Sequence, residues 1–132
     1  MLTWLSHPVV LVSLGGALGA NARYWLSWWM RHQAWAAGFP WATLLTNIVG
    51  SILLGIILVV TLENLHQQHR SMYLLLGTGF CGAFTTFSTF EYETLELIHR
   101  GFWGRALAYV GVSFLAGLAG VAIAVFVTRR LI

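Results

Sequence analysis

The stretch GFCGAFTTFSTF, residues 79–90, decides how this sequence folds. It carries two glycines, four side-chain hydroxyls and four phenylalanines, and it contains no charged residue. Together with Gly77, the glycines Gly79 and Gly82 weaken any helix that passes through this segment. Backbone that leaves the helix at membrane depth is tolerated only where it is buried in protein or lines a cavity. The stretch therefore predicts a helix that is broken at its middle, with hydroxyls and aromatic rings beside the break.

The composition around this stretch is that of an integral membrane protein. The 132 residues are 58% hydrophobic and 8% charged, with a mean hydropathy of +0.77. All seven basic residues are arginines scattered along the chain, which disfavours nucleic-acid binding. A bilayer-spanning helix needs roughly 20 apolar residues. We expect an all-α membrane protein, a single integral membrane domain over 1–132, with four transmembrane helices at about 8–30, 40–62, 72–98 and 102–128.

The arginines divide evenly between the two sides of such a four-span chain. Because consecutive spans alternate in direction, the amino terminus, the second link and the carboxyl terminus share one face. The rule that basic loops remain in the cytoplasm then gives no orientation. Either another feature sets the orientation, or the chain inserts both ways and two copies pair in opposite senses. The first face has Arg70, Arg129 and Arg130, and the other has Arg31, Arg100 and Arg105.

Polar residues inside the first two spans are candidates for function, because ionisable and amide groups are costly in lipid. Arg23 lies well inside the first span, where it either reaches the headgroups or attracts an anion into a water-filled entrance. Thr43, Asn47 and Ser51 recur every four residues and therefore share one face of the second span. Asn47 is either a hydrogen-bonding link between helices or a donor that lines a pore.

The fourth and first spans carry weaker patterns of the same kind. Tyr109, Ser113 and Gly117 also recur every four residues, and form either a link between helices or a polar track. Gly15 and Gly19 form a G-x-x-x-G pattern in the first span, which favours close helix contact. Packing within the chain is the more common role of such glycines.

The second half of the third span combines rings and hydroxyls without a carboxylate until Glu91. The positive edge of an aromatic ring can face a small anion without supplying a counter-charge. This chemistry suits a weakly held anion better than a metal cation. Phe84, Phe87 and Phe90 step by three along one face, and Thr85, Ser88 and Thr89 form the neighbouring face.

At three places the sequence resembles the Fluc/CrcB family of fluoride channels. These are GGALGANARY (15–24), PWATLLTNIVGS (40–51) and GFCGAFTTFSTF (79–90), and the four-span layout is similar over essentially the whole chain. The resemblance implies an antiparallel, dual-topology homodimer in a bacterial inner membrane. It also implies two separate pores for passive export of fluoride, which protects the cell against fluoride toxicity.

The resemblance also implies which residues form the pathway. A structural sodium ion at the dimer centre would be held by the backbone carbonyls of Gly82 and Thr85. Thr43 and Glu93 match family pore positions whose roles are less defined. The full set implied for the ion pathway is Arg23, Thr43, Asn47, Phe87, Ser88, Thr89, Phe90, Glu93, Tyr109 and Ser113.

Three positions depart from the family pattern, and other functions remain as alternatives. Ala83 replaces a frequent glycine, Gly117 replaces a frequent hydroxyl, and Glu91 stands where relatives often have a small residue. The alternatives are a proton-coupled fluoride transporter, a small-multidrug-type transporter, and a structural subunit without a pathway. An enzyme is not expected, because no histidine pairs with a nucleophile at catalytic spacing. The acids that a multidrug transporter would need inside its spans lie near the ends of the apolar runs, at Glu63, Glu91, Glu93 and Glu96.

Overall fold

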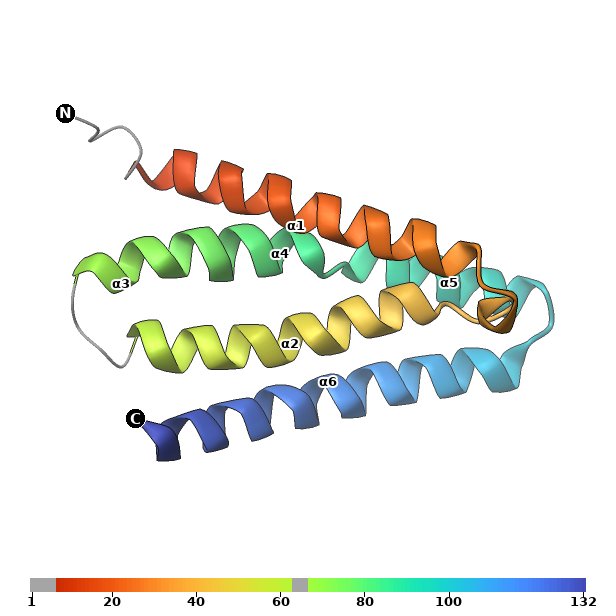
Figure 1. The fold of residues 1–132 in the computed structure, drawn as a ribbon. Helices are drawn as coiled ribbons and strands as arrows, with labels where there is room; N and C mark the ends of the chain where they lie inside the picture. Colours follow the sequence, from red (N-terminus) through yellow and green to blue (C-terminus); the bar gives the residue numbers. More distant parts are fainter. Residues whose placement is uncertain (1–6, 63–66) are drawn as a thin grey trace.

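The computed structural model describes residues 7–62 and 67–132, and within these residues the chain is helical, with no strand (Figure 1). Four long helical segments follow one another, and the third is divided into several parts. In order, the elements are α1 (Pro8–Arg31), η2 (Ala34–Ala36), α2 (Trp41–Leu62), α3 (Gln67–Met72), η3 (Tyr73–Cys81), α4 (Gly82–Phe84), α5 (Phe87–His99) and α6 (Trp103–Leu131).

The four segments run alternately up and down the bundle. The start of α1 and the end of α6 lie at one end, and the α1–α2 and α5–α6 links lie at the other (Figure 1). α2 packs along α6, and α1 packs along η3 and α4. Among the described residues, two helices are long and apolar enough to cross a membrane, within Trp41–Thr61 and Trp103–Leu131. The predicted apolar runs agree with the observed helices to within a few residues. The expectation that Glu63 lies near the end of such a run concerns a residue outside the described ones.

Local sequence signals explain where α1 begins and α5 ends. Pro8 opens α1, where its missing N–H removes no helical hydrogen bond, and the His7 side chain accepts from the amide of Val9. Gly101 follows α5 with a φ of +81°, a left-handed conformation that suits glycine. The amide of Phe102 then donates to the carbonyl of Leu97, which completes a Schellman-type end. The chain therefore reverses sharply into α6.

The third segment is broken, but not at its glycines. Gly82 has helical dihedrals (φ −60°, ψ −35°), and helix continues to Phe84. Thr85 (φ −79°, ψ 159°) and Thr86 (φ −153°, ψ 121°) are extended, and α5 begins immediately afterwards. The predicted break is therefore present, but it follows the glycines Gly77, Gly79 and Gly82 that were expected to cause it. The break needs a side-chain partner for the backbone of Thr86, rather than the flexibility of glycine.

The glycines instead allow α1 to approach the third segment closely. Its nine residues Tyr73–Cys81 form a π-helix, which is wider than an α-helix. A Cβ atom on Gly15 would overlap the carbonyl oxygen of Leu75, and one on Gly19 would overlap that of Phe80. A Cβ on Gly79 would lie 2.9 Å from the Cα of Gly15. The G-x-x-x-G pattern thus serves packing within the chain.

Replacing Gly15 with alanine is expected to destabilise the protein, because the new methyl group would meet rigid backbone rather than a movable side chain. Overpacking of this kind costs about 1–3 kcal/mol. Gly16→Ala is the matched control, since a Cβ at Gly16 has no atom within 4 Å. Thermal unfolding of the purified variants in detergent measures the difference. Equal stability of the two variants would contradict the close contact between α1 and η3.

The interior is small, and much of the apolar surface faces outward. One core cluster contains Leu44, Leu97, Ala106 and Tyr109, at the end of the bundle where α5 turns into α6. Large side chains such as Leu107 and Phe114 are exposed by 72% and 69%. A surface of this kind suits lipid or a second subunit rather than water.

Candidate functional site

Asn47 holds the break in the third segment through both backbone groups of one residue, Thr86. Its side-chain oxygen accepts from the amide of Thr86 at 2.8 Å, and its side-chain nitrogen donates to the Thr86 carbonyl at 3.1 Å. The two bonds satisfy backbone groups that an unbroken helix would have satisfied internally. Asn47 is therefore a link between α2 and the break. One hydrogen of its NH₂ group remains for another acceptor, so a pore-lining role is compatible with this geometry.

Arg23 caps the first half of the broken segment from α1. Its Nε donates to the carbonyl of Ala83 at 3.1 Å, which lies in the last helical turn before the break. The carbonyl end of a helix carries partial negative charge, so a cation is favoured there. Of the two expectations for Arg23, this contact fits neither fully, because half-buried Arg23 binds the protein backbone.

Thr86 starts the second half of the broken segment. Its hydroxyl accepts from the amide of Thr89 at 3.3 Å and donates to the Thr89 hydroxyl at 3.0 Å. The Thr85 hydroxyl donates to the backbone carbonyl of Cys81, in the preceding helical turn, at 2.9 Å. Thr86 was not singled out as a site residue from the sequence, although a threonine before a helical run is a recognisable N-cap signal.

A groove of about 510 Å³ lies beside the break, between α2 and the third segment. Gly82 and Phe87 line it and are exposed, and Phe87 is 71% accessible. The amide of Thr86 bonds Asn47 instead of the Gly82 carbonyl, so among the described residues that carbonyl has no backbone donor. The groove is also lined by Asn47, Gly50, Ser51, Leu54, Tyr73, Gly77, Thr78, Cys81, Thr85 and Thr86.

Glu93 forms a second polar cluster, about two turns further along α5. Thr43 from α2 donates to one carboxylate oxygen at 3.0 Å, and Tyr109 from α6 donates to the other at 2.7 Å. Thr43 is 5% accessible and Tyr109 is completely buried, whereas Glu93 is half-buried. The sequence pattern alone could not bring these three helices together, yet the two four-residue faces containing Thr43 and Tyr109 do meet here.

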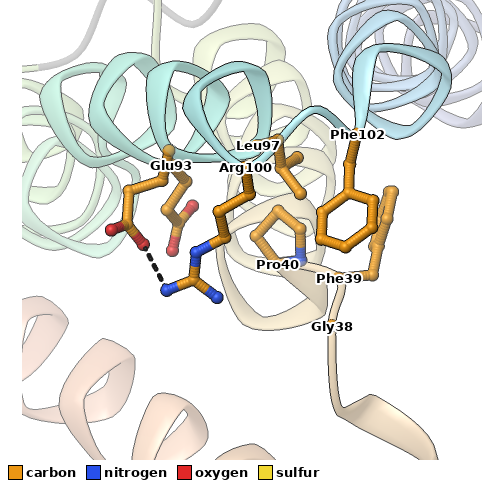
Figure 2. Close-up of a pocket in the computed structure, with 8 residues that line it drawn as sticks. Gly38, Phe39, Pro40, Glu93, Leu97, Arg100 and Phe102 are labelled. Atoms are coloured by element: carbon orange, nitrogen blue, oxygen red, sulfur yellow. Dashed lines mark hydrogen bonds and ion pairs between the residues drawn. The ribbon is translucent and has the colours of Figure 1, made fainter.

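Glu93 also lies where two cavities meet. The larger, of about 280 Å³, is lined by Ser27, Arg31, Thr43 and Thr89, among others. The smaller, of about 160 Å³, is shown in Figure 2, where Glu93 and Leu97 of α5, and Arg100 just after it, face Phe39, Pro40 and Phe102. An ion pair of 3.3 Å joins Arg100 to Glu96 at the rim of this smaller cavity.

The remaining predicted residues are Phe87, Ser88 and Phe90 on α5 and Ser113 on α6. The Phe90 ring is tilted against that of Tyr109, with ring centroids 5.0 Å apart, and its centroid lies 5.9 Å from that of Phe87. Ser113 has a buried hydroxyl oxygen without a hydrogen-bond partner among the described residues. Ser88 is exposed on α5. The roles of these hydroxyls and rings in an ion pathway stay a prediction.

The three departures from the family pattern have clear positions. Ala83 lies inside a helical turn and offers its carbonyl to Arg23, so no glycine is needed there. A Cβ on Gly117 would lie 3.6 Å from the hydroxyl of Ser51, which places this part of α6 against α2. Glu91 is exposed and lines none of the cavities described above.

Helices able to cross a membrane, packed around a broken helix with polar side chains, define an all-helical membrane protein. The chain belongs to the family described as CrcB-like protein, Camphor Resistance (CrcB), which matches residues 10–125. Three relatives are each named "Fluoride-specific ion channel FluC". That of Roseiflexus sp. is 42% identical over 93% of this chain and 98% of its own length. The relative from Thermus thermophilus is 44% identical over 83% and 84%, and that from Koribacter versatilis is 50% identical over 70% and 72%.

Proposed function

We propose that this chain is a fluoride-selective channel that lets fluoride leave the cell passively across the bacterial inner membrane. The observation that carries the proposal is its similarity, over nearly the whole chain, to proteins named fluoride-specific ion channel. An ion channel is not a class of enzyme. The multi-pass arrangement is supported by the two highly apolar helices and by the alternating direction of the four segments.

The side chains between the break and Glu93, here called the polar side of the bundle, offer a small anion the groups that it needs. Fluoride binds water strongly, so donors must replace its hydration shell step by step. Asn47, Thr89, Tyr109 and Ser113 bring amide and hydroxyl groups to this side, and Phe87 and Phe90 bring ring edges. Several weak sites allow the ion to leave as well as to bind. We infer that small size and dense donors favour fluoride over chloride.

We propose further that two copies pair in opposite orientations, with two pores per dimer. Phe87 is 71% exposed in the single chain, and the groove beside the break is open, so a partner would complete this surface. The equal numbers of arginines at the two ends of the bundle are consistent with insertion both ways. Labelling a single introduced terminal cysteine from one side of intact vesicles tests this pairing. Modification of about half the copies supports it, and all or none contradicts it.

The break also suits a structural sodium ion at the dimer centre. Sodium is a hard cation that prefers oxygen ligands, and carbonyls at broken helices can supply them. The carbonyl of Gly82 has no backbone donor in the described part of the chain, and exposed Gly82 leaves room for a second copy. Gly82 and Thr85 would hold the ion, which would supply positive charge where the two breaks meet. Thermal stability of the purified dimer should be lower in choline chloride than in sodium chloride, and equal stability would contradict the assignment.

A reversal-potential measurement separates the channel from a proton-coupled transporter. With purified protein in a planar bilayer and a fluoride gradient, a channel's current reverses at the fluoride equilibrium potential. A pH gradient above neutrality should leave that potential unchanged. A coupled carrier would shift it, because protons then contribute to the driving force. A subunit without a pathway would carry no current.

A further inference from the structure

The carboxylate of Glu93 occupies two hydroxyl donors at one end of the proposed pathway. Thr43 donates to one oxygen and Tyr109 to the other, at 3.0 and 2.7 Å. A hydroxyl has one proton, so neither group can donate to a second acceptor at the same time. Both donors are buried, Thr43 on α2 and Tyr109 on α6, and these two helices pack along each other. The Glu93 carboxylate thus occupies the position where a small anion would find two hydrogen-bond donors.

Glu93 is also placed where an entering anion would meet it, because it lines two cavities. It lines both cavities at this end of the bundle, one with Arg31 and the other with Arg100. Figure 2 shows the smaller cavity, lined by Glu93 of α5 and by Arg100, which directly follows this helix. An anion drawn in by either arginine meets the Glu93 carboxylate next. The arginines therefore attract the anion into the two cavities, and the Glu93 carboxylate, which lines both, repels it.

We propose that Glu93 is a built-in competitor of the permeant anion, which holds Thr43 and Tyr109 and thereby limits the rate of fluoride passage. The inference rests on the proposed channel function and assigns a role within it. Fluoride must take the hydroxyls from a carboxylate, and hydrogen bonds to a charged acceptor are stronger than neutral ones. Glu93 therefore acts on passage through the donors that it occupies.

The competing explanation is that Glu93 only ties α5 to α2 and α6. The two explanations predict opposite effects of Glu93→Gln, which keeps the shape of the side chain and removes its charge. If Glu93 is a competitor, Glu93→Gln should raise fluoride flux at least about threefold, because one hydroxyl then faces a neutral carbonyl oxygen and the other an NH₂ group that accepts no hydrogen bond. If Glu93 only ties the helices together, Glu93→Gln weakens that tie and should leave fluoride flux unchanged or lower it.

Fluoride release from proteoliposomes, followed with a fluoride electrode, measures this effect. Glu96→Gln is the matched control: Glu96 lines the same small cavity and pairs with Arg100, but it contacts neither hydroxyl. We expect faster release with Glu93→Gln and a much smaller change with Glu96→Gln. Equal acceleration by both would mean that general charge at the opening, not competition for donors, controls the rate. That outcome, or no acceleration by Glu93→Gln, overturns the proposal.

A double-mutant cycle gives a second, independent test. Tyr109→Phe removes the hydroxyl and keeps the ring. If Glu93 occupies that hydroxyl, Tyr109→Phe should slow release by a larger factor in the Glu93→Gln background than in the wild type. Independent effects of the two substitutions would contradict competition. If Glu93→Gln does not give a folded dimer, Glu93→Ala replaces it in the same cycle.

The same assay keeps the two levels of inference apart. If the wild-type protein releases no fluoride, the proposed channel function fails. If the wild type releases fluoride and Glu93→Gln is no faster, the function stands and the role of Glu93 is wrong. Thermal unfolding of each variant identifies any change that comes only from loss of folded protein.

Discussion

Replacing Asn47 with alanine is expected to remove most of the fluoride flux. The substitution deletes two hydrogen bonds to the Thr86 peptide, at 2.8 and 3.1 Å, and leaves an amide and a carbonyl unsatisfied at membrane depth. At roughly 1 kcal/mol for each bond, the geometry of the break becomes about 10- to 30-fold less populated. The loss of the remaining amide donor reduces flux further.

Two further variants show which property of Asn47 matters. Asn47→Asp keeps an acceptor for the Thr86 amide but has no donor for the Thr86 carbonyl, and it adds a negative charge. We therefore expect it to be as inactive as Asn47→Ala, although its helices still assemble. Asn21→Ala is the control, because Asn21 is an exposed helical asparagine bonded only to its own helix, at Ala17. Wild-type release of fluoride by Asn47→Ala in proteoliposomes would contradict the importance of this contact.

Replacing Arg23 with methionine is expected to have the second largest effect, because it removes both a helix cap and a positive charge. The Nε of Arg23 donates to the Ala83 carbonyl at 3.1 Å, at the end of the first half of the broken helix. A cation at a helix end contributes about 0.3–1 kcal/mol at an exposed site, and more where partly buried. With the loss of attraction for the anion added, we expect fluoride flux to fall about tenfold.

Arg23→Gln separates these two contributions. The amide nitrogen of glutamine follows the same number of side-chain atoms as Nε of arginine, so it can donate to the Ala83 carbonyl without a charge. We expect Arg23→Gln to unfold near the wild-type temperature, with an intermediate flux, and Arg23→Met to be less stable. If Arg23→Met is as stable as the wild type, the capping contact is not important.

The number and approximate limits of the helical segments could be predicted from the sequence, because membrane thickness sets the length of an apolar run. The four-residue spacing of Thr43 and Asn47 also predicted one polar face of α2. In the structure both residues contact the third segment, Asn47 at the break and Thr43 at Glu93 of α5. Such predictions work because helical periodicity is a property of neighbouring residues in the sequence.

The position of the break could not be predicted, because it depends on contacts between distant residues. The glycines suggested a break near Gly82, but the extended residues are Thr85 and Thr86, and the backbone of Thr86 has its partner in Asn47 from α2. The partner of Arg23 was equally hidden, since a backbone carbonyl such as that of Ala83 has no sequence signature. The glycines are needed for a different reason, namely the close approach of α1 to the third segment.

Passive fluoride release from liposomes containing the purified protein tests the proposed function most directly. Vesicles loaded with equal fluoride and chloride are diluted into a halide-free potassium-poor buffer, and valinomycin is added so that potassium can leave with the anion. We expect fluoride to be released rapidly on addition of valinomycin and chloride to be retained. Vesicles that contain folded protein and keep their fluoride, or that release both halides alike, would contradict a fluoride-selective channel.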